Sequence, residues 1–386
     1  MTDPSLPGNA SYPSIGDAVL SRRFSASYSE GRQKFLTSCR NNGFALSSHH
    51  HPSLKGPSGE DLAIDAAWLG PENASRVVIF SCGTHGLEAA PGAATMLHWL
   101  ETGGPSRLPG DMAVLLIHAI NPFGWAWAHR INEDGIDLNR NFADRGNALP
   151  SNTAYKDIHH LLMDTSMDED GLSRFVQAFH ELAAQKGMNT ALTGITSGQY
   201  DFPDGLSFGG VALSWSSKVL FQIARDHLSQ ARKIAHIDWH TGIGEYGRAH
   251  FILDEPKTSE SYSVLSSWWP DHTIHCDDVV EGVSIFYNGL FLEGLRKEIR
   301  SFSPAQVVNV TIEWGTYDVE KMVQALVMDN WLMHRANGSS PAQVDAVRSD
   351  LIERFYPRDP AWRSGVLKAS ETIYAQAIAG LDNWND

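Results

Sequence analysis

Short apolar runs separated by polar turns predict the strands of an α/β protein. Residues 77–81, 113–120 and 306–312 are rich in valine, isoleucine and leucine. Strands buried on both faces have this composition, because helices cover both sides of a parallel sheet. Residues 62–68, which alternate in polarity, and residues 233–240 predict two further strands. We therefore expect a mixed, largely parallel sheet flanked by helices.

Apolar residues at helical spacing predict helices around these strands. The predicted helices cover residues 15–40, 88–100, 172–186, 217–231, 322–333, 342–355 and 364–381. The first 15 residues are rich in proline, glycine and serine, which predicts a loose arm over residues 1–15. No repeat or composition shift marks a second boundary, so residues 16–386 are expected to form one domain that includes a C-terminal helical extension.

The first candidate for chemistry is a glycine-punctuated turn after the strand at 77–81. His85 and Glu88 lie three residues apart there, so an imidazole nitrogen and a carboxylate oxygen can converge on one cation. The carboxyl end of a strand is also where open α/β sheets bind ligands. The spacing recurs at His98 and Glu101, where we expect a solvated helix end. The histidine triplet 49–51 is expected to have a solvated or structural role, because adjacent residues of a loop point in different directions.

The second candidate stretch follows the strand at 113–120. Arg130, Asp137, Asn139 and Arg140 occur within eleven residues. An arginine guanidinium suits a carboxylate or a developing oxyanion, so Asn139 and Arg140 could clamp a free substrate carboxylate. A polar loop of surface salt bridges is an equally good interpretation of the same residues.

Two later strands end in further candidates. The strand at 233–240 carries His236, Asp238 and His240 on one face, and His240 would complete a set of three ligands with His85 and Glu88. His236 is typical of a core residue or of a residue behind a ligand. Glu313 ends the strand at 306–312 beside a glycine, and a buried carboxylate there must be either paired or functional.

Composition limits the partners. The chain has 386 residues and a formal net charge of −15, which argues against nucleic acid and anionic membrane surfaces. Its three cysteines are too few for a disulfide framework, and the N-terminus lacks the pattern of a signal peptide. We expect a cytoplasmic protein that has no membrane span; the sequence leaves a homo-oligomer open.

Taken together, four motifs carry a resemblance that none carries alone. They are His85-x-x-Glu88, Asp137-Leu-Asn139-Arg140-Asn-Phe, Asp238-Trp-His240-Thr-Gly and Thr-Ile-Glu313. In type and order they resemble the zinc carboxypeptidase (M14-like) clan. The longer versions, such as Ser-Cys-Gly-Thr-His-Gly-Leu-Glu and Thr-Ile-Glu-Trp-Gly-Thr-Tyr, are similar to the bacterial M14-like family DUF2817, and the similarity extends over nearly the whole chain.

The resemblance implies a role for each matching position. His85, Glu88 and His240 match the zinc ligands, Glu313 the general base and acid, and Arg130 the oxyanion-stabilising arginine. Asp137 matches the aspartate behind a ligand histidine, and Asn139 with Arg140 the group that binds the terminal carboxylate. Tyr287 is the preferred match for the clan's mobile tyrosine, and Tyr317 is the alternative.

The implied function is a zinc-dependent hydrolase of a peptide or amide bond, carboxypeptidase-like, with one zinc per chain. Its substrate would be a small peptide. An N-acyl-amino-acid deacylase, resembling the aspartoacylase and succinylglutamate desuccinylase branch, is the alternative within hydrolases and would act on an N-acyl amino acid. A catalytically silent binding protein that keeps the metal cleft, and a two-metal site using His236 or Asp238, are further alternatives. Gly135 and residues 89–91 depart from the family pattern and put the shape of the pocket in doubt.

Overall fold

The computed structural model describes residues 15–146, 148–276 and 287–384. The described residues form an eight-stranded mixed sheet in the order β1-β2-β4-β3-β5-β8-β6-β7. The strands are β1 (Ala45–Lys55), β2 (Asp61–Leu69), β3 (Arg76–Cys82), β4 (Met112–His118), β5 (Lys233–Gly242), β6 (Ala249–Ile252), β7 (Ile274–His275) and β8 (Gln306–Gly315). The central strands β4, β3, β5 and β8 are mutually parallel. Strand β2 pairs antiparallel with β1 and β4, and β6 pairs antiparallel with β8 but parallel with β7. The predicted fold class is confirmed.

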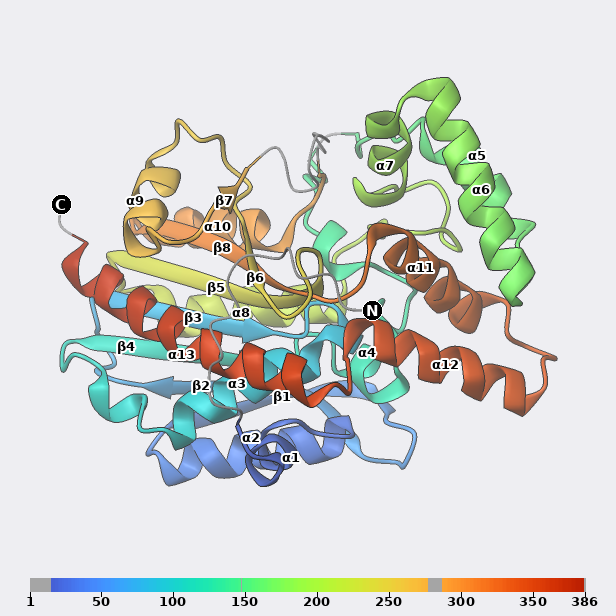
Figure 1. The fold of residues 1–386 in the computed structure, drawn as a ribbon. Helices are drawn as coiled ribbons and strands as arrows, with labels where there is room; N and C mark the ends of the chain where they lie inside the picture. Colours follow the sequence, from blue (N-terminus) through green and yellow to red (C-terminus); the bar gives the residue numbers. More distant parts are fainter. Residues whose placement is uncertain (1–14, 147, 277–286, 385–386) are drawn as a thin grey trace, which may run out of the picture.

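Helices cover both faces of the sheet, as the continuous apolar strands predict. On one face, α3 (Ala89–Glu101) and α13 (Pro360–Asn383) lie across the central strands, with α1 (Asp17–Arg23), α2 (Tyr28–Asn41) and α9 (Glu260–Trp268) beside them (Figure 1). On the other face, α8 (Trp215–Leu228) and α10 (Phe291–Phe302) pack. Alternate residues of one strand serve the two layers: Val78 and Phe80 face α3 and α13, whereas Val77 and Ile79 face α8 and α10.

A separate helical cluster stands at one end of the sheet (Figure 1). It comprises α5 (Tyr155–Met163), α6 (Glu169–Lys186), α7 (Met188–Thr196), α11 (Val319–His334) and α12 (Pro341–Phe355). The short helices η1 (Gly86–Glu88), η2 (Pro105–Arg107), α4 (Pro122–Trp127) and η3 (Leu138–Arg140) complete the described elements. None of the helices in the described ranges is long and apolar enough to cross a bilayer.

The structure corrects three sequence predictions. The helix expected over residues 15–40 is two helices, because the chain extends after Arg23 and Ser27 then caps α2 by accepting a hydrogen bond from Glu30 N. The histidines at 49–51 belong to strand β1 and not to a loop. This strand is formed by backbone pairing with β2, although its sequence lacks the apolar pattern typical of a strand. His98 is buried rather than solvated and contacts Glu371 Oε1 at 2.5 Å between α3 and α13. The arm predicted over residues 1–15 lies, except for Ile15, outside the described residues.

Candidate metal centre

The candidate ligands meet at the carboxyl ends of two neighbouring parallel strands. His85 and Glu88 lie in the turn and η1 helix after β3, and His240 lies near the end of β5. The turn depends on glycine: Gly83 has φ of +81°, and a Cβ at Gly86 would lie 2.1 Å from the backbone of Gly124. The close approach lets Gly86 N and Leu87 N donate hydrogen bonds to the carbonyls of residues 130 and 129.

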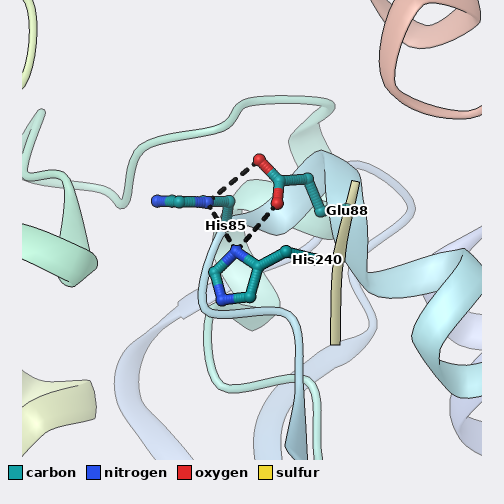
Figure 2. A group of neighbouring side chains, drawn as sticks. All are labelled: His85, Glu88 and His240. Carbon is teal, nitrogen blue, oxygen red and sulfur yellow. Dashed lines mark hydrogen bonds and ion pairs between the residues drawn. The ribbon is translucent and has the colours of Figure 1, made fainter. Parts of the chain in front are cut away.

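The three side chains point at one another (Figure 2). Glu88 Oε1 lies 2.9 Å from His85 Nδ1, and Glu88 Oε2 lies 3.0 Å from His240 Nδ1. The two Nδ1 atoms are 3.2 Å apart, and one ligand atom from each residue falls within 4.8 Å of the others. All three residues are buried. The structure thus brings together the predicted ligand set.

Each histidine has a carboxylate behind it. His85 Nε2 is 3.0 Å from Asp137 Oδ1, and His240 Nε2 is 2.6 Å from Asp238 Oδ2. An ionised carboxylate only accepts, so each Nε2–H donates to the carboxylate behind it, and with a metal bound each Nδ1 would present its lone pair to the ion. Ser81 and Thr84 in turn donate to Asp238, and Ser81 Oγ also contacts His236 Nε2. The family resemblance predicted this supporting role for Asp137, whereas Asp238 was predicted only as a possible ligand of a second ion. Asp238 and His240 lie on the same face of one strand, and this spacing could have indicated that Asp238 contacts His240.

The charges of the centre favour a bound cation. Burial alone would raise the pKa of Asp137, yet Arg130 and His85 hold it well below its ordinary value. Burial likewise opposes ionisation of Glu88, but His85 and His240 lower its pKa. The pKa of Asp238 is also lowered, against burial, chiefly by His240. Three buried carboxylates therefore face one guanidinium and two imidazoles.

The donor set fits zinc. Two imidazole nitrogens and one carboxylate oxygen are three ligands of the kind that catalytic zinc sites use, and such ligand histidines donate their second nitrogen to a carboxylate. A divalent cation would also balance the excess of buried negative charge. The described residues supply one such group of ligand atoms, at His85, Glu88 and His240.

Glu313 lies beside the centre, at the end of β8 and opposite His240 in the parallel register. Its carboxylate is buried, and the described hydrogen bond to it is a long one, 3.4 Å from Ile243 N. Burial, and next the nearby Glu88, raise the pKa of Glu313 to about 8, with His240 and Arg130 opposing. A carboxyl group whose pKa lies near neutrality can both take up and release a proton.

Arg130 is held from both ends. Its Nη1 donates to Asp137 Oδ2 at 2.6 Å, and its Nε lies 3.4 Å from Glu88 Oε1. Its backbone N–H donates to Asp329 of helix α11 at 3.0 Å, and the adjacent His129 Nδ1 lies 2.8 Å from the other Asp329 oxygen. Asp329 is buried and lies about two hundred residues away in sequence, so no local pattern pointed to it.

A pocket opens next to the ligands and contains most of the remaining candidates. Arg130, Asn139, Arg140, Tyr287 and Glu313 all line it, together with His85. The Arg140 guanidinium carbon lies 4.8 Å from the centre of the Tyr287 ring, and burial raises the pKa of Tyr287 to about 12. Tyr317 is not part of the lining; its hydroxyl lies 3.2 Å from Glu353 Oε1.

The predicted carboxylate clamp faces this pocket through groups that remain available. Asn139 Oδ1 accepts a hydrogen bond from Phe291 N, which leaves the Nδ2 amide group without a described protein partner. Arg140 Nε and Nη1 donate to the carbonyls of Thr196 and Asn139, and its Nη2 has no partner in the described part of the chain. Residues 193–207, a stretch with several glycines and serines, thus border the site through Thr196.

The fold and these side chains define an α/β protein with a buried His–Glu–His group that could hold a metal ion. A family model described as "Protein of unknown function (DUF2817)" matches residues 24–369. The chain belongs to the DUF2817 family, which confirms the nearer resemblance. A comparison with curated proteins gives no match.

Solved structures share the fold at low identity. Carboxypeptidase A from Helicoverpa armigera is 12% identical; the match covers 86% of this chain and 74% of that one, with a TM-score of 0.46. A provisionally titled metallopeptidase from Shewanella baltica is 14% identical, with coverages of 78% and 88% and a TM-score of 0.38. A provisionally titled succinylglutamate desuccinylase/aspartoacylase from Shewanella frigidimarina is 16% identical, with coverages of 74% and 72% and a TM-score of 0.37. Because these scores are all below 0.5, we base the function on this chain's own residues.

Proposed function

We propose that this protein is a zinc-dependent hydrolase that cleaves a peptide or amide bond next to a free carboxylate. The observation that carries the proposal is the buried His85, Glu88 and His240 group, with Glu313 and the Arg140 pocket opening beside it. A silent binding protein would not need a buried, unpaired carboxylate beside its metal ligands.

Zinc would be held by His85, Glu88 and His240, one ion per chain, and when bound it supplies Lewis acidity and acidifies water. Asp137 and Asp238 fix the tautomer and orientation of the two histidines through the Nε2 hydrogen bonds.

The chain's own groups then divide the work. Glu313 takes a proton from the attacking water and returns it to the leaving amine. Arg130 places its guanidinium where charge develops on the carbonyl oxygen, while Asp137 and Asp329 hold it in place. Arg140 and Asn139 bind the terminal carboxylate, and Tyr287 covers Arg140.

The test compares the parent protein with its Glu313→Gln variant. Metal analysis should find about one zinc per chain in both, because Glu313 is outside the ligand set. A panel of short peptides and N-acyl amino acids should yield product with the parent only, and the substrate class cleaved separates a peptidase from a deacylase. Glu245→Gln, on an exposed loop after β5, is the matched control and should keep parental activity. Protein that contains no zinc and cannot be reconstituted with it would contradict the proposal, and a stoichiometry near two would point to a second ion.

A further inference from the structure

The pocket beside the candidate metal centre contains two opposite charges that do not pair with each other. Arg140 makes its described hydrogen bonds to backbone carbonyls alone, and the Asp254 carboxylate has no hydrogen bond or ion pair with any described residue. The other two charged groups near the opening are already used: Arg130 pairs with Asp137, and Glu313 faces the ligands. Arg140 and Asp254 are therefore the two charges available to a ligand.

Asp254 differs from the acidic residues around it. Glu255 forms an ion pair with Arg296, and Glu293 pairs with Lys297 at 2.5 Å. Asp254 lies two residues after the short strand β6, whose antiparallel pairing with β8 brings it to the pocket that Glu313 also lines. The nearby cations are thus engaged elsewhere, while Asp254 alone of these three acidic residues lines the pocket.

The surroundings of Asp254 favour an incoming cation. Although Asp254 is exposed to solvent, the protein packed around it, and next the nearby Glu293, raise its pKa to about 7; Arg296 and Arg140 oppose this. A positive group on a ligand would favour the ionised form and would gain a charge-assisted hydrogen bond.

The wall between the two charges is apolar. Ile243, Ile252, Leu253, Leu290 and Leu292 contribute to the lining. A methylene stem packs well against such a surface while its charged end reaches a polar group, as lysine and arginine side chains do.

We propose that Asp254 is the specificity-determining residue of this pocket, and that the terminal residue of the substrate carries a cationic side chain such as lysine or arginine besides its free carboxylate. This inference rests on the proposed function: Arg140 holds the carboxylate, the apolar wall holds the methylene stem, and Asp254 pairs with the cation.

The test uses acylated dipeptides that end in lysine or in norleucine, which has a similar length without the charge. The zinc-loaded parent should show a kcat/KM at least about tenfold higher for the lysine substrate. Asp254→Asn should bring this ratio close to one, and Asp254→Lys should shift the preference to a substrate ending in glutamate. Asp226→Asn removes an exposed carboxylate of helix α8, which does not line the pocket, and should keep the parental ratio.

A binding measurement separates this inference from the hydrolase itself. Calorimetry of free lysine and norleucine with the purified protein should show tighter binding of lysine, and Asp254→Asn should remove the difference. Preference for lysine in binding, with no hydrolysis of any substrate, would support the subsite and overturn the hydrolase. Hydrolysis without preference for lysine in either assay would overturn the subsite and leave the hydrolase standing.

Discussion

The metal centre and the pocket next to it differ in whether their charged side chains are paired. In the centre, each ionised group has a partner of opposite sign: Asp137 contacts Arg130 and His85, and Asp238 contacts His240. In the pocket, neither Arg140 nor Asp254 forms an ion pair with a described residue.

The difference separates two tasks. A buried charge is costly unless it is paired, so the network around His85 and His240 fixes the positions of the ligand atoms before any ligand arrives. Charges left without partners keep their interaction energy for a ligand that supplies the opposite charge. We expect substitutions in the paired network to affect metal binding and turnover, and substitutions in the pocket to affect the choice of substrate.

Among substitutions that remove one of these pairings, Arg130→Ala should have the largest effect, since Arg130 belongs to both regions: it pairs with Asp137 and lines the pocket. Loss of one oxyanion-stabilising donor typically lowers kcat by about a hundred- to a thousandfold. Zinc content, measured on the same preparation, should stay near that of the parent. Arg248→Ala, at an exposed arginine, provides the control. Near-parental turnover of Arg130→Ala would remove Arg130 from the proposed mechanism.

Asp238→Asn tests whether the second histidine–carboxylate pair matters as much as the first. An asparagine amide holds His240 Nε2 less well and carries no charge, so zinc affinity should fall by about ten- to a hundredfold, a typical loss for residues behind a metal ligand. Asp137→Asn should cause a loss of the same order. A competitive chelator titration measures both, with Asp226→Asn as the exposed control. Unchanged zinc affinity in Asp238→Asn would show that the 2.6 Å hydrogen bond between Asp238 and His240 stabilises the fold and not the metal site.

The sequence carries strong signals for the central sheet and for the paired network. Continuous apolar runs predicted β3, β4 and β8 because these strands are buried on both faces. His85 and Glu88 follow β3 and His240 lies near the end of β5, so the carboxyl edge of a parallel sheet brings them together.

The remaining features depend on pairings that no local pattern encodes. Strand β1 is polar and at the edge, so its histidines resemble those of a loop. Asp254 enters the pocket only because the short β6 pairs with β8, and Asp329 reaches Arg130 from a distant helix. Asp254 was therefore less predictable than Arg140, which the sequence already indicated as part of a carboxylate clamp.

His118 provides the smallest and most indirect test, since it is a buried histidine without the carboxylate contact that His85 and His240 have. Its ring stacks on Phe35 with centroids 4.4 Å apart, and neither ring nitrogen has a partner among the described residues. Burial lowers the pKa of His118 to about 4, against a small opposing effect of Asp65.

The sign of the pH effect follows from linkage. In the unfolded chain His118 binds a proton below its ordinary pKa of about 6.5. In the folded protein it stays neutral until the pH falls to about 4. The His118 contribution to stability is thus present above pH 6.5 and is lost as the solution becomes more acidic, by about 2 kcal/mol between pH 7 and pH 5. His118→Phe keeps the stacking and cannot titrate, so its free energy of unfolding in urea should fall less over this interval by about that amount. If the free energy of unfolding of His118→Phe instead falls as steeply with pH as that of the parent, a buried histidine without a partner costs this core little stability. The carboxylates behind His85 and His240 would then be needed for metal binding and not for the stability of the fold.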